Sequence, residues 1–164
     1  MEYSQRKRLR LTSYDYSQPG YYFITICTRE RSREVLCSIE PAVGAIINRP
    51  PRIFLTPVGR IVDGTIRAIP DHYPGISVDQ YVVMPDHVHL ILSFRHVGPD
   101  GRQIAAPTPL PNVIQQMKRI ASKQAGGPLW QKGFYDHVIR NDEDLTNVRQ
   151  YIRDNPLKWV QDKD

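Results

Sequence analysis

The chain has 164 residues, a formal net charge of +5 and a pI of about 9.3. Its length predicts a single domain, and its 40% hydrophobic and 24% charged residues are typical of a soluble globular protein. No apolar run approaches the ~20 residues that span a bilayer, and no apolar signal-peptide segment follows the charged N-terminus, so we expect a cytoplasmic protein without membrane contact.

The first elements predict a β-hairpin. Residues 21–28 are aromatic and β-branched and follow a Pro19-Gly20 turn, as is typical of a strand. Residues 34–37 predict a short second strand that pairs with the first. The next stretch, 38–55, is rich in proline, so we expect mostly loop there. The only two cysteines fall in these strands, and with no disulfide framework we expect reduced, partly buried thiols.

The middle of the chain predicts a helix and a second hairpin. Residues 56–70 carry a threonine N-cap, a first-turn proline, apolar residues at helical spacing and a terminating proline. Residues 76–84 and 87–94 are apolar and β-branched, and the short Pro85-Asp86 connection allows them to pair. Residues 95–111 are rich in glycine and proline and predict an exposed, mobile loop.

The C-terminal part predicts two helices around a short strand. Residues 112–124 have an apolar helical face, and residues 134–139 are extended in character. A final helix starts with Asp142 as its N-cap and breaks at Asn155-Pro156, because proline disfavours helical geometry in the preceding residue. This element order predicts an α+β sandwich, with a mainly antiparallel sheet and helices packed on one face.

Two histidines are the main chemical signal. His87 and His89 are two residues apart in an apolar strand, so both imidazoles project from one face while Val88 faces the other. Paired neutral imidazoles are good ligands for a divalent metal. The spacing alone is a weak signal, and two histidines on a solvated sheet face are the alternative.

Basic residues gather in an arm within about residues 1–18 and on the predicted helix 112–124. They are Arg6, Lys7, Arg8, Arg10, Lys118, Arg119 and Lys123. Such clusters favour a polyanionic partner such as nucleic acid. For either cluster taken singly, a charged, solvated face is the favoured interpretation.

Four stretches together resemble a known family: residues 84–92 with the H-x-H, 129–141, 148–159 and 14–20. They are similar to the single-tyrosine HUH transposases, and most similar to the REP-associated tyrosine transposases, over nearly the whole chain. The resemblance implies a ferredoxin-like sandwich. It also implies a metal-dependent single-strand DNA endonuclease and strand transferase, acting on hairpin-forming repeats through a 5′-phosphotyrosine intermediate.

The resemblance also implies the roles of individual residues. His87 and His89 match the family's histidine–hydrophobic–histidine motif and would bind Mg²⁺ or Mn²⁺. Tyr151 matches the nucleophile. Asn155 lies where the smallest insertion-sequence enzymes carry a glutamine that completes the metal site, and it is one methylene shorter.

The residues themselves leave alternatives open. Tyr151 and Asn155 share a helix face at i, i+4, yet Tyr151 also fits a core aromatic and Asn155 a helix C-terminal cap. Tyr135 is the rival tyrosine. The implied partner is single-stranded or hairpin DNA, and both monomer and homodimer are open. A non-catalytic DNA-binding domain and a hydrolytic metalloenzyme are the other candidate functions, and the lack of a third histidine beside the H-x-H disfavours the latter.

Overall fold

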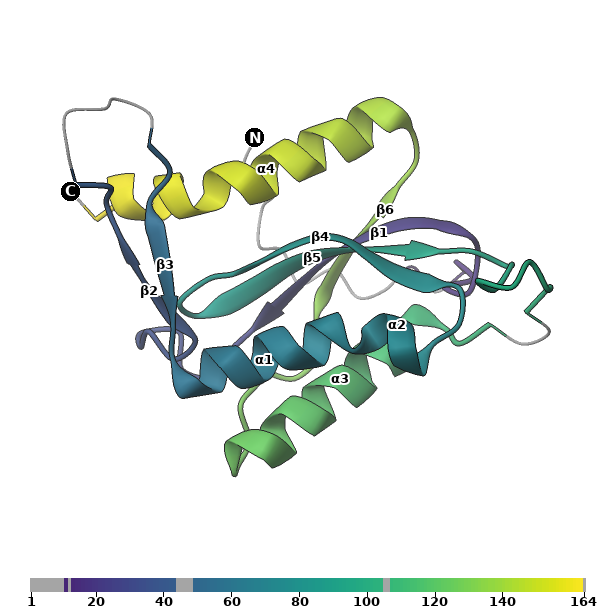
Figure 1. Ribbon diagram of the computed structural model, residues 1–164, viewed down its shortest axis with the longest axis horizontal. Helices are drawn as coiled ribbons and strands as arrows, with labels where there is room; N and C mark the ends of the chain where they lie inside the picture. Colours follow the sequence, from purple (N-terminus) through teal and green to yellow (C-terminus); the bar gives the residue numbers. More distant parts are fainter. Residues whose placement is uncertain (1–10, 12, 44–48, 105–106, 164) are drawn as a thin grey trace.

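A four-stranded antiparallel sheet forms the centre of the computed structural model, which describes residues 11, 13–43, 49–104 and 107–163 (Figure 1). Its strands are β1 (Gly20–Cys27), β4 (Ile76–Val83), β5 (His87–Phe94) and β6 (Tyr135–Ile139), in the order β4-β5-β1-β6. The helices are α1 (Pro57–Arg67), α2 (Ile69–His72), α3 (Leu110–Ala125) and α4 (Asp142–Gln161).

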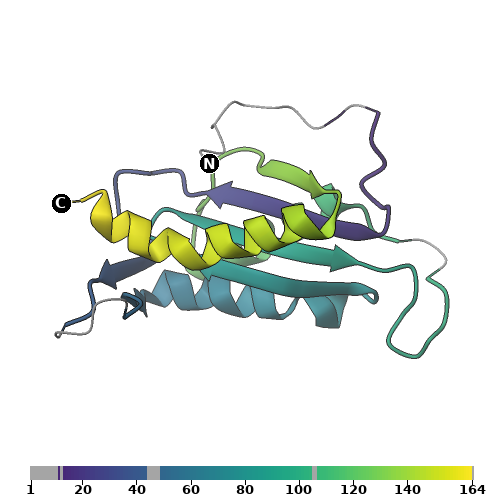
Figure 2. The ribbon, with the colours of Figure 1, turned by 90° about the horizontal axis from the view of Figure 1, so that it is seen from above.

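The sheet and two of the helices have the expected ferredoxin-like arrangement. The order β1-α1-β4-β5-α3-β6 places α1 and α3 on one face (Figure 1), so the predicted α+β class is confirmed. The expectation that helices cover only one face is wrong, because α4 covers the other. Figure 2, which looks down on α4, shows this helix running along the sheet.

Burial explains why both faces are covered. All eight residues of β5 are buried, so each side of this central strand needs a packing partner. Val88 and Leu90 belong to the core under α1 and α3. Phe23 and Ile91 belong to a second core, which Val148 of α4 closes. The apolar side of α4 therefore covers the second face of the sheet.

A second, two-stranded sheet corrects the expectation of a loop at 38–55. It pairs β2 (Cys37–Glu40) with β3 (Arg52–Leu55). The predicted pairing of residues 34–37 with the first strand is wrong, because β5 and β6 already occupy the two edges of β1. Residues 44–48 lie outside the described residues. Both cysteines are free thiols, one half-buried and one buried.

The final helix continues through Pro156, where we expected a break. Pro156 is buried inside α4 and removes one backbone hydrogen bond of the helix. Trp159 and Val160, beyond the proline, pack against the second core. Their burial offsets the lost hydrogen bond, so tertiary packing overrides the local preference.

The other predicted boundaries hold to within a few residues. Pro70 does not end α1 but lies in the first turn of α2, where its missing N–H costs nothing. Asn141 rather than Asp142 caps α4, its Oδ1 accepting from the Asp144 backbone N–H at 2.8 Å. The predicted loop 95–111 is irregular up to α3 except for a Val97–Gln103 bridge, with residues 105–106 outside the described part.

Hydrogen bonds through the Val35–Leu36 segment connect the start of α1 to the segment before the histidine strand. The Thr56 hydroxyl donates to the Val35 carbonyl at 2.7 Å and caps α1 by accepting from the Gly59 N–H at 3.0 Å. The Leu36 N–H donates to the Pro85 carbonyl at 3.0 Å.

None of the described helices is both long and apolar enough to cross a bilayer.

Gly59 permits the close approach of α1 to this segment. A Cβ at Gly59 would lie 1.8 Å from the Leu36 carbonyl oxygen, whereas one at Gly64 would meet nothing within 4 Å. We expect Gly59→Ala to lower the free energy of unfolding by roughly 2–3 kcal/mol. Gly64→Ala in the same helix should raise it by roughly 0.5–1 kcal/mol. Urea unfolding of both variants measures this, and equal stabilities would contradict the close approach.

Candidate active site

His87 and His89 both project from β5 toward α4. Their Nε2 atoms lie 3.1 Å apart. The exposed fractions of the two residues are 8% for His87 and 5% for His89. Val88, between them, packs in the core on the opposite face. The geometry expected from the two-residue spacing is therefore present, and the pair is buried rather than on a solvated face.

The other ring nitrogens have protein partners. His87 Nδ1 lies 2.6 Å from Asp86 Oδ1, and His89 Nδ1 lies 2.8 Å from Thr25 Oγ1. A proton donated from Nδ1 to the carboxylate or hydroxyl leaves the lone pair of Nε2 available, and such contacts fix ring orientation in metal sites. Asp86 is held in turn by Arg31, whose Nε donates to Oδ2 at 3.2 Å. The two Nε2 atoms are thus oriented toward a common point.

The electrostatics favour a neutral His89 and an ionised Asp86. Burial, and then the proximity of His87, hold the pKa of His89 well below its ordinary value. Burial opposes ionisation of Asp86, but its hydrogen bond to His87 and the proximity of His87 and Arg31 outweigh burial and lower its pKa. A metal ion requires a neutral imidazole as its ligand, and the lowered pKa of His89 favours that state.

The spacing of the two imidazoles fits a six-coordinate divalent ion. Two neighbouring ligands about 2.2 Å from such an ion are about 3.1 Å apart, which is the Nε2–Nε2 separation here. Among the residues that the structure describes, no group of three or more His, Cys, Asp or Glu side chains is arranged for a metal. The resemblance implies Asn155, on α4, as a third ligand, and that role stays a prediction.

Tyr151 lies beside the histidines within the same chain. Its ring centroid is 5.3 Å from that of His89 and 6.0 Å from that of Phe23, and the side chain is half-buried. The pKa of the phenol is raised, because the effect of burial outweighs that of a side-chain hydrogen bond with Asn155, which lowers it. Lys158 Nζ lies 5.7 Å from the Tyr151 ring centroid. Tyr151 thus packs at the edge of the second core and also faces the imidazole pair.

Several contacts in the site were missed by the sequence analysis. Thr25 lies opposite His89 because of the β1–β5 register, which a single sequence does not show. The Trp159 ring centroid lies 6.3 Å from that of His87. Lys158 and Trp159 follow Tyr151 at helical spacing, and this spacing is the sequence signal that could have placed them near the site. Asp86 adjoins the H-x-H, and that adjacency hinted at its role.

Seven basic residues are predicted to bind DNA, and those that the structure describes do not lie beside the histidines. Arg6, Lys7, Arg8 and Arg10 lie outside the described residues. Lys118, Arg119 and Lys123 are on α3, across the sheet from α4 (Figure 1). Lys118 Nζ donates to the carbonyls of Gln131 and Gly133 at 2.8 and 2.6 Å, and Arg119 donates to Gln116 at 2.7 Å.

Comparisons with known proteins point to one family. No protein-family model matches the chain. An uncharacterised protein of Haemophilus influenzae is 27% identical over 175 residues, covering 96% of this chain and 92% of that protein. A second protein of that organism, provisionally named a REP-associated tyrosine transposase, is 26% identical over 151 residues, covering 88% and 74%. A solved REP-associated tyrosine transposase bound to a REP hairpin covers 93% of this chain and 74% of its own, with a TM-score of 0.63 and 21% identity. The chain resembles REP-associated tyrosine transposases.

The buried His89 predicts a pH dependence of stability. Its pKa is lowered on folding, so below about pH 6.5 the unfolded chain binds a proton that the folded chain resists. The free energy of unfolding of the metal-free protein should therefore fall as the pH drops from 7.5 to 5.5. His89→Gln should remove up to about 1.4 kcal/mol per pH unit of this slope. Parallel pH profiles for the two proteins, measured by urea unfolding, would contradict the expectation.

Proposed function

We propose that this chain is a metal-dependent single-strand DNA endonuclease and strand transferase that acts on hairpin-forming repeat DNA. The observation that carries the proposal is the meeting of Tyr151 and the imidazole pair on one side of the sheet, with 5.3 Å between the Tyr151 and His89 ring centroids. The relative named for REP-associated transposition and the hairpin-bound structural neighbour support DNA hairpins as the substrate.

The donor groups fit a bound Mg²⁺ or Mn²⁺. When bound, the ion would polarise the scissile phosphate and stabilise the charge that develops on it. His87 and His89 would hold it through Nε2, with the Asn155 amide oxygen as a third ligand. Asp86 and Thr25 would keep the two rings oriented, as their 2.6 and 2.8 Å contacts with the Nδ1 atoms do already.

Tyr151 would act as the nucleophile. Its phenol oxygen forms a bond to the phosphorus, the P–O3′ bond of the DNA breaks, and the phenol proton passes to the departing 3′ oxygen. The product is a 5′-phosphotyrosine link and a free 3′ hydroxyl, so the phosphodiester energy is kept for joining to another strand. Lys158, with Nζ 5.7 Å from the Tyr151 ring centroid, is the cation of α4 beside this ring and would contact the phosphate under attack.

The proposed site would form within one copy. The imidazoles come from β5, while Tyr151 and Asn155 come from α4 of the same chain. The proposed site can therefore form in a monomer as well as in a homodimer. A non-catalytic hairpin-binding domain is the second candidate, and the low exposure of the imidazoles, 8% and 5%, favours it. Trp159 also lies beside the pair, with its ring centroid 6.3 Å from that of His87.

A covalent adduct tests the nucleophile. Incubation with a hairpin oligonucleotide carrying a single-stranded flank and Mn²⁺ should give a protein–DNA species on a denaturing gel. Tyr151→Phe should abolish it, because the attacking oxygen is gone. Tyr135→Phe, on β6, is the matched control and should keep it. An adduct that survives Tyr151→Phe would refute the assignment, and hairpin binding without any adduct would favour the non-catalytic domain.

Metal affinity tests the role of Asp86. Asp86→Asn removes the charge that orients His87, and we expect Mn²⁺ affinity to fall by about 10–100-fold. Asp63→Asn is the matched control, since that carboxylate on α1 accepts from the Tyr81 hydroxyl at 2.6 Å away from the histidines. Electron paramagnetic resonance of free Mn²⁺ measures both. Equal affinities in the two variants would show that Asp86 does not orient a ligand.

The histidine variants separate binding from cleavage. His87→Ala and His89→Ala should lose adduct formation by at least about a hundredfold while keeping hairpin affinity, because the pair acts on the scissile phosphate only. Gel-shift titration and the adduct assay measure the two properties on the same samples. Full cleavage in both variants would exclude the metal role.

A further inference from the structure

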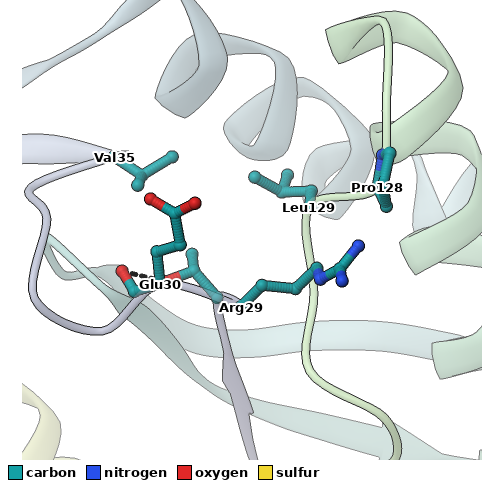
Figure 3. A pocket seen from close by; sticks show the side chains of 6 residues that line it. Arg29, Glu30, Val35, Pro128 and Leu129 are labelled. Atoms are coloured by element: carbon teal, nitrogen blue, oxygen red, sulfur yellow. Dashed lines mark hydrogen bonds between the residues drawn. The ribbon is translucent and has the colours of Figure 1, made fainter.

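Two adjacent hollows lie where the chain leaves β1. They have volumes of about 510 and 440 Å³ and share Arg29 and Pro128 in their linings. Figure 3 shows the first hollow, between the segment that follows β1 and the segment that follows α3. The second extends it past Trp130 to Lys132. The two hollows, which meet at Arg29 and Pro128, are here together called the Arg29 groove.

The Arg29 groove has an excess of positive charge. Arg29 and Lys132 line it, both exposed, and among the described residues neither makes an ion pair with a carboxylate. Glu30 is the one acidic residue in the lining, and Arg33 neutralises it at 3.1 Å. In Figure 3 the Arg29 guanidinium extends toward Pro128, away from the Glu30 carboxylate.

The backbone around these two cations is held in place. Lys118 Nζ donates to the carbonyls of Gln131 and Gly133, at 2.8 and 2.6 Å, and so clamps the residues on both sides of Lys132. The Arg29 N–H donates to the Leu129 carbonyl at 3.0 Å. A fixed backbone with exposed cationic side chains is preorganised for an anionic ligand. Lys118 is thus a positioning residue for Lys132.

The Arg29 groove adjoins the histidine pair. Cys27 lies opposite His87 in the β1–β5 register, and Arg29 follows two residues later. Thr28 binds the Asp86 carbonyl with its N–H at 2.9 Å and its hydroxyl at 3.0 Å. Neighbouring strands are about 4.8 Å apart, so the groove begins about one strand spacing from the backbone of His87. The groove and the imidazole pair therefore lie at the same end of β1 and β5.

We propose that the Arg29 groove binds the sugar–phosphate backbone of the single-stranded DNA that flanks the cleaved bond. This inference rests on the proposed function and specifies where its substrate lies. Arg29 and Lys132 would contact successive phosphates, as cationic grooves that follow single strands do. A flexible single strand can place its phosphates against both cations, so the occupant is the flank rather than the hairpin stem.

Binding of a fluorescent oligothymidylate of about 12 nucleotides tests the proposal, measured by anisotropy without divalent metal over a range of salt. Arg29→Ala/Lys132→Ala should bind at least about tenfold more weakly at ~0.1 M salt, and its salt slope should be shallower by about 1.4, since two contacts are lost. Arg29→Lys/Lys132→Arg should restore binding. Arg95→Ala/Arg140→Ala is the matched control, because these exposed residues follow β5 and β6 at the opposite end of the sheet.

The outcomes separate this inference from the proposed function. With Mn²⁺ and a hairpin substrate that carries a single-stranded flank, Arg29→Ala/Lys132→Ala should need a higher substrate concentration than the unaltered chain to reach half-maximal Tyr151 adduct. If it binds the oligothymidylate as the control does while the unaltered chain forms the adduct, only the groove is overturned. If inorganic phosphate competes as well as the oligonucleotide at equal phosphate concentration, the hollow is an isolated anion site and the proposal is wrong. If the unaltered chain neither binds DNA nor forms an adduct, both proposals fail.

Discussion

The antiparallel pairing of β1 with β5 determines where the site can form. In this register Thr25 lies opposite His89 and Cys27 opposite His87, and the two-residue alternation turns both imidazoles to the face that α4 covers. The same pairing supplies a hydroxyl 2.8 Å from His89 Nδ1, so the buried ring has a polar partner. At the start of β5, Asp86 is the polar partner of His87 Nδ1, and Arg31 holds Asp86 in turn. A one-residue slip in this register would send the imidazoles into the opposite core.

The helix that carries Tyr151 also closes the second core. Val148 and Ile152, on either side of Tyr151, are buried against the sheet, so packing sets the height of the phenol above His89. Arg149 adds a bidentate contact with Asp79 of β4, at 2.9 and 2.6 Å, that fixes the helix along the sheet. Apolar burial and this ion pair therefore position the candidate nucleophile, and the chemistry depends on the integrity of the core.

Local patterns predicted the elements whose signals are strong, and failed where long-range contacts decide. The H-x-H strand, the first strand and the capped helix at Thr56 follow from residue types and periodicity alone. The β2–β3 hairpin was missed because proline composition hid two short strands that pair with each other. The predicted helix break at Pro156 was wrong, because packing of the partly buried Trp159 against the second core offsets one lost backbone hydrogen bond. The contacts of Thr25 and Lys118 depend on register and tertiary placement, which one sequence does not specify.

The proposed nuclease activity rests on the convergence of two imidazoles from β5 with a phenol from α4, in a chain that resembles the REP-associated tyrosine transposases. The most direct measurement is a crystal structure of the chain with Mn²⁺, with an anomalous difference map collected at the manganese edge. One peak about 2.2 Å from the Nε2 atoms of both His87 and His89, on the side that Tyr151 faces, is the expected result. A map without a peak between these atoms, or with the two rings turned apart, would contradict it.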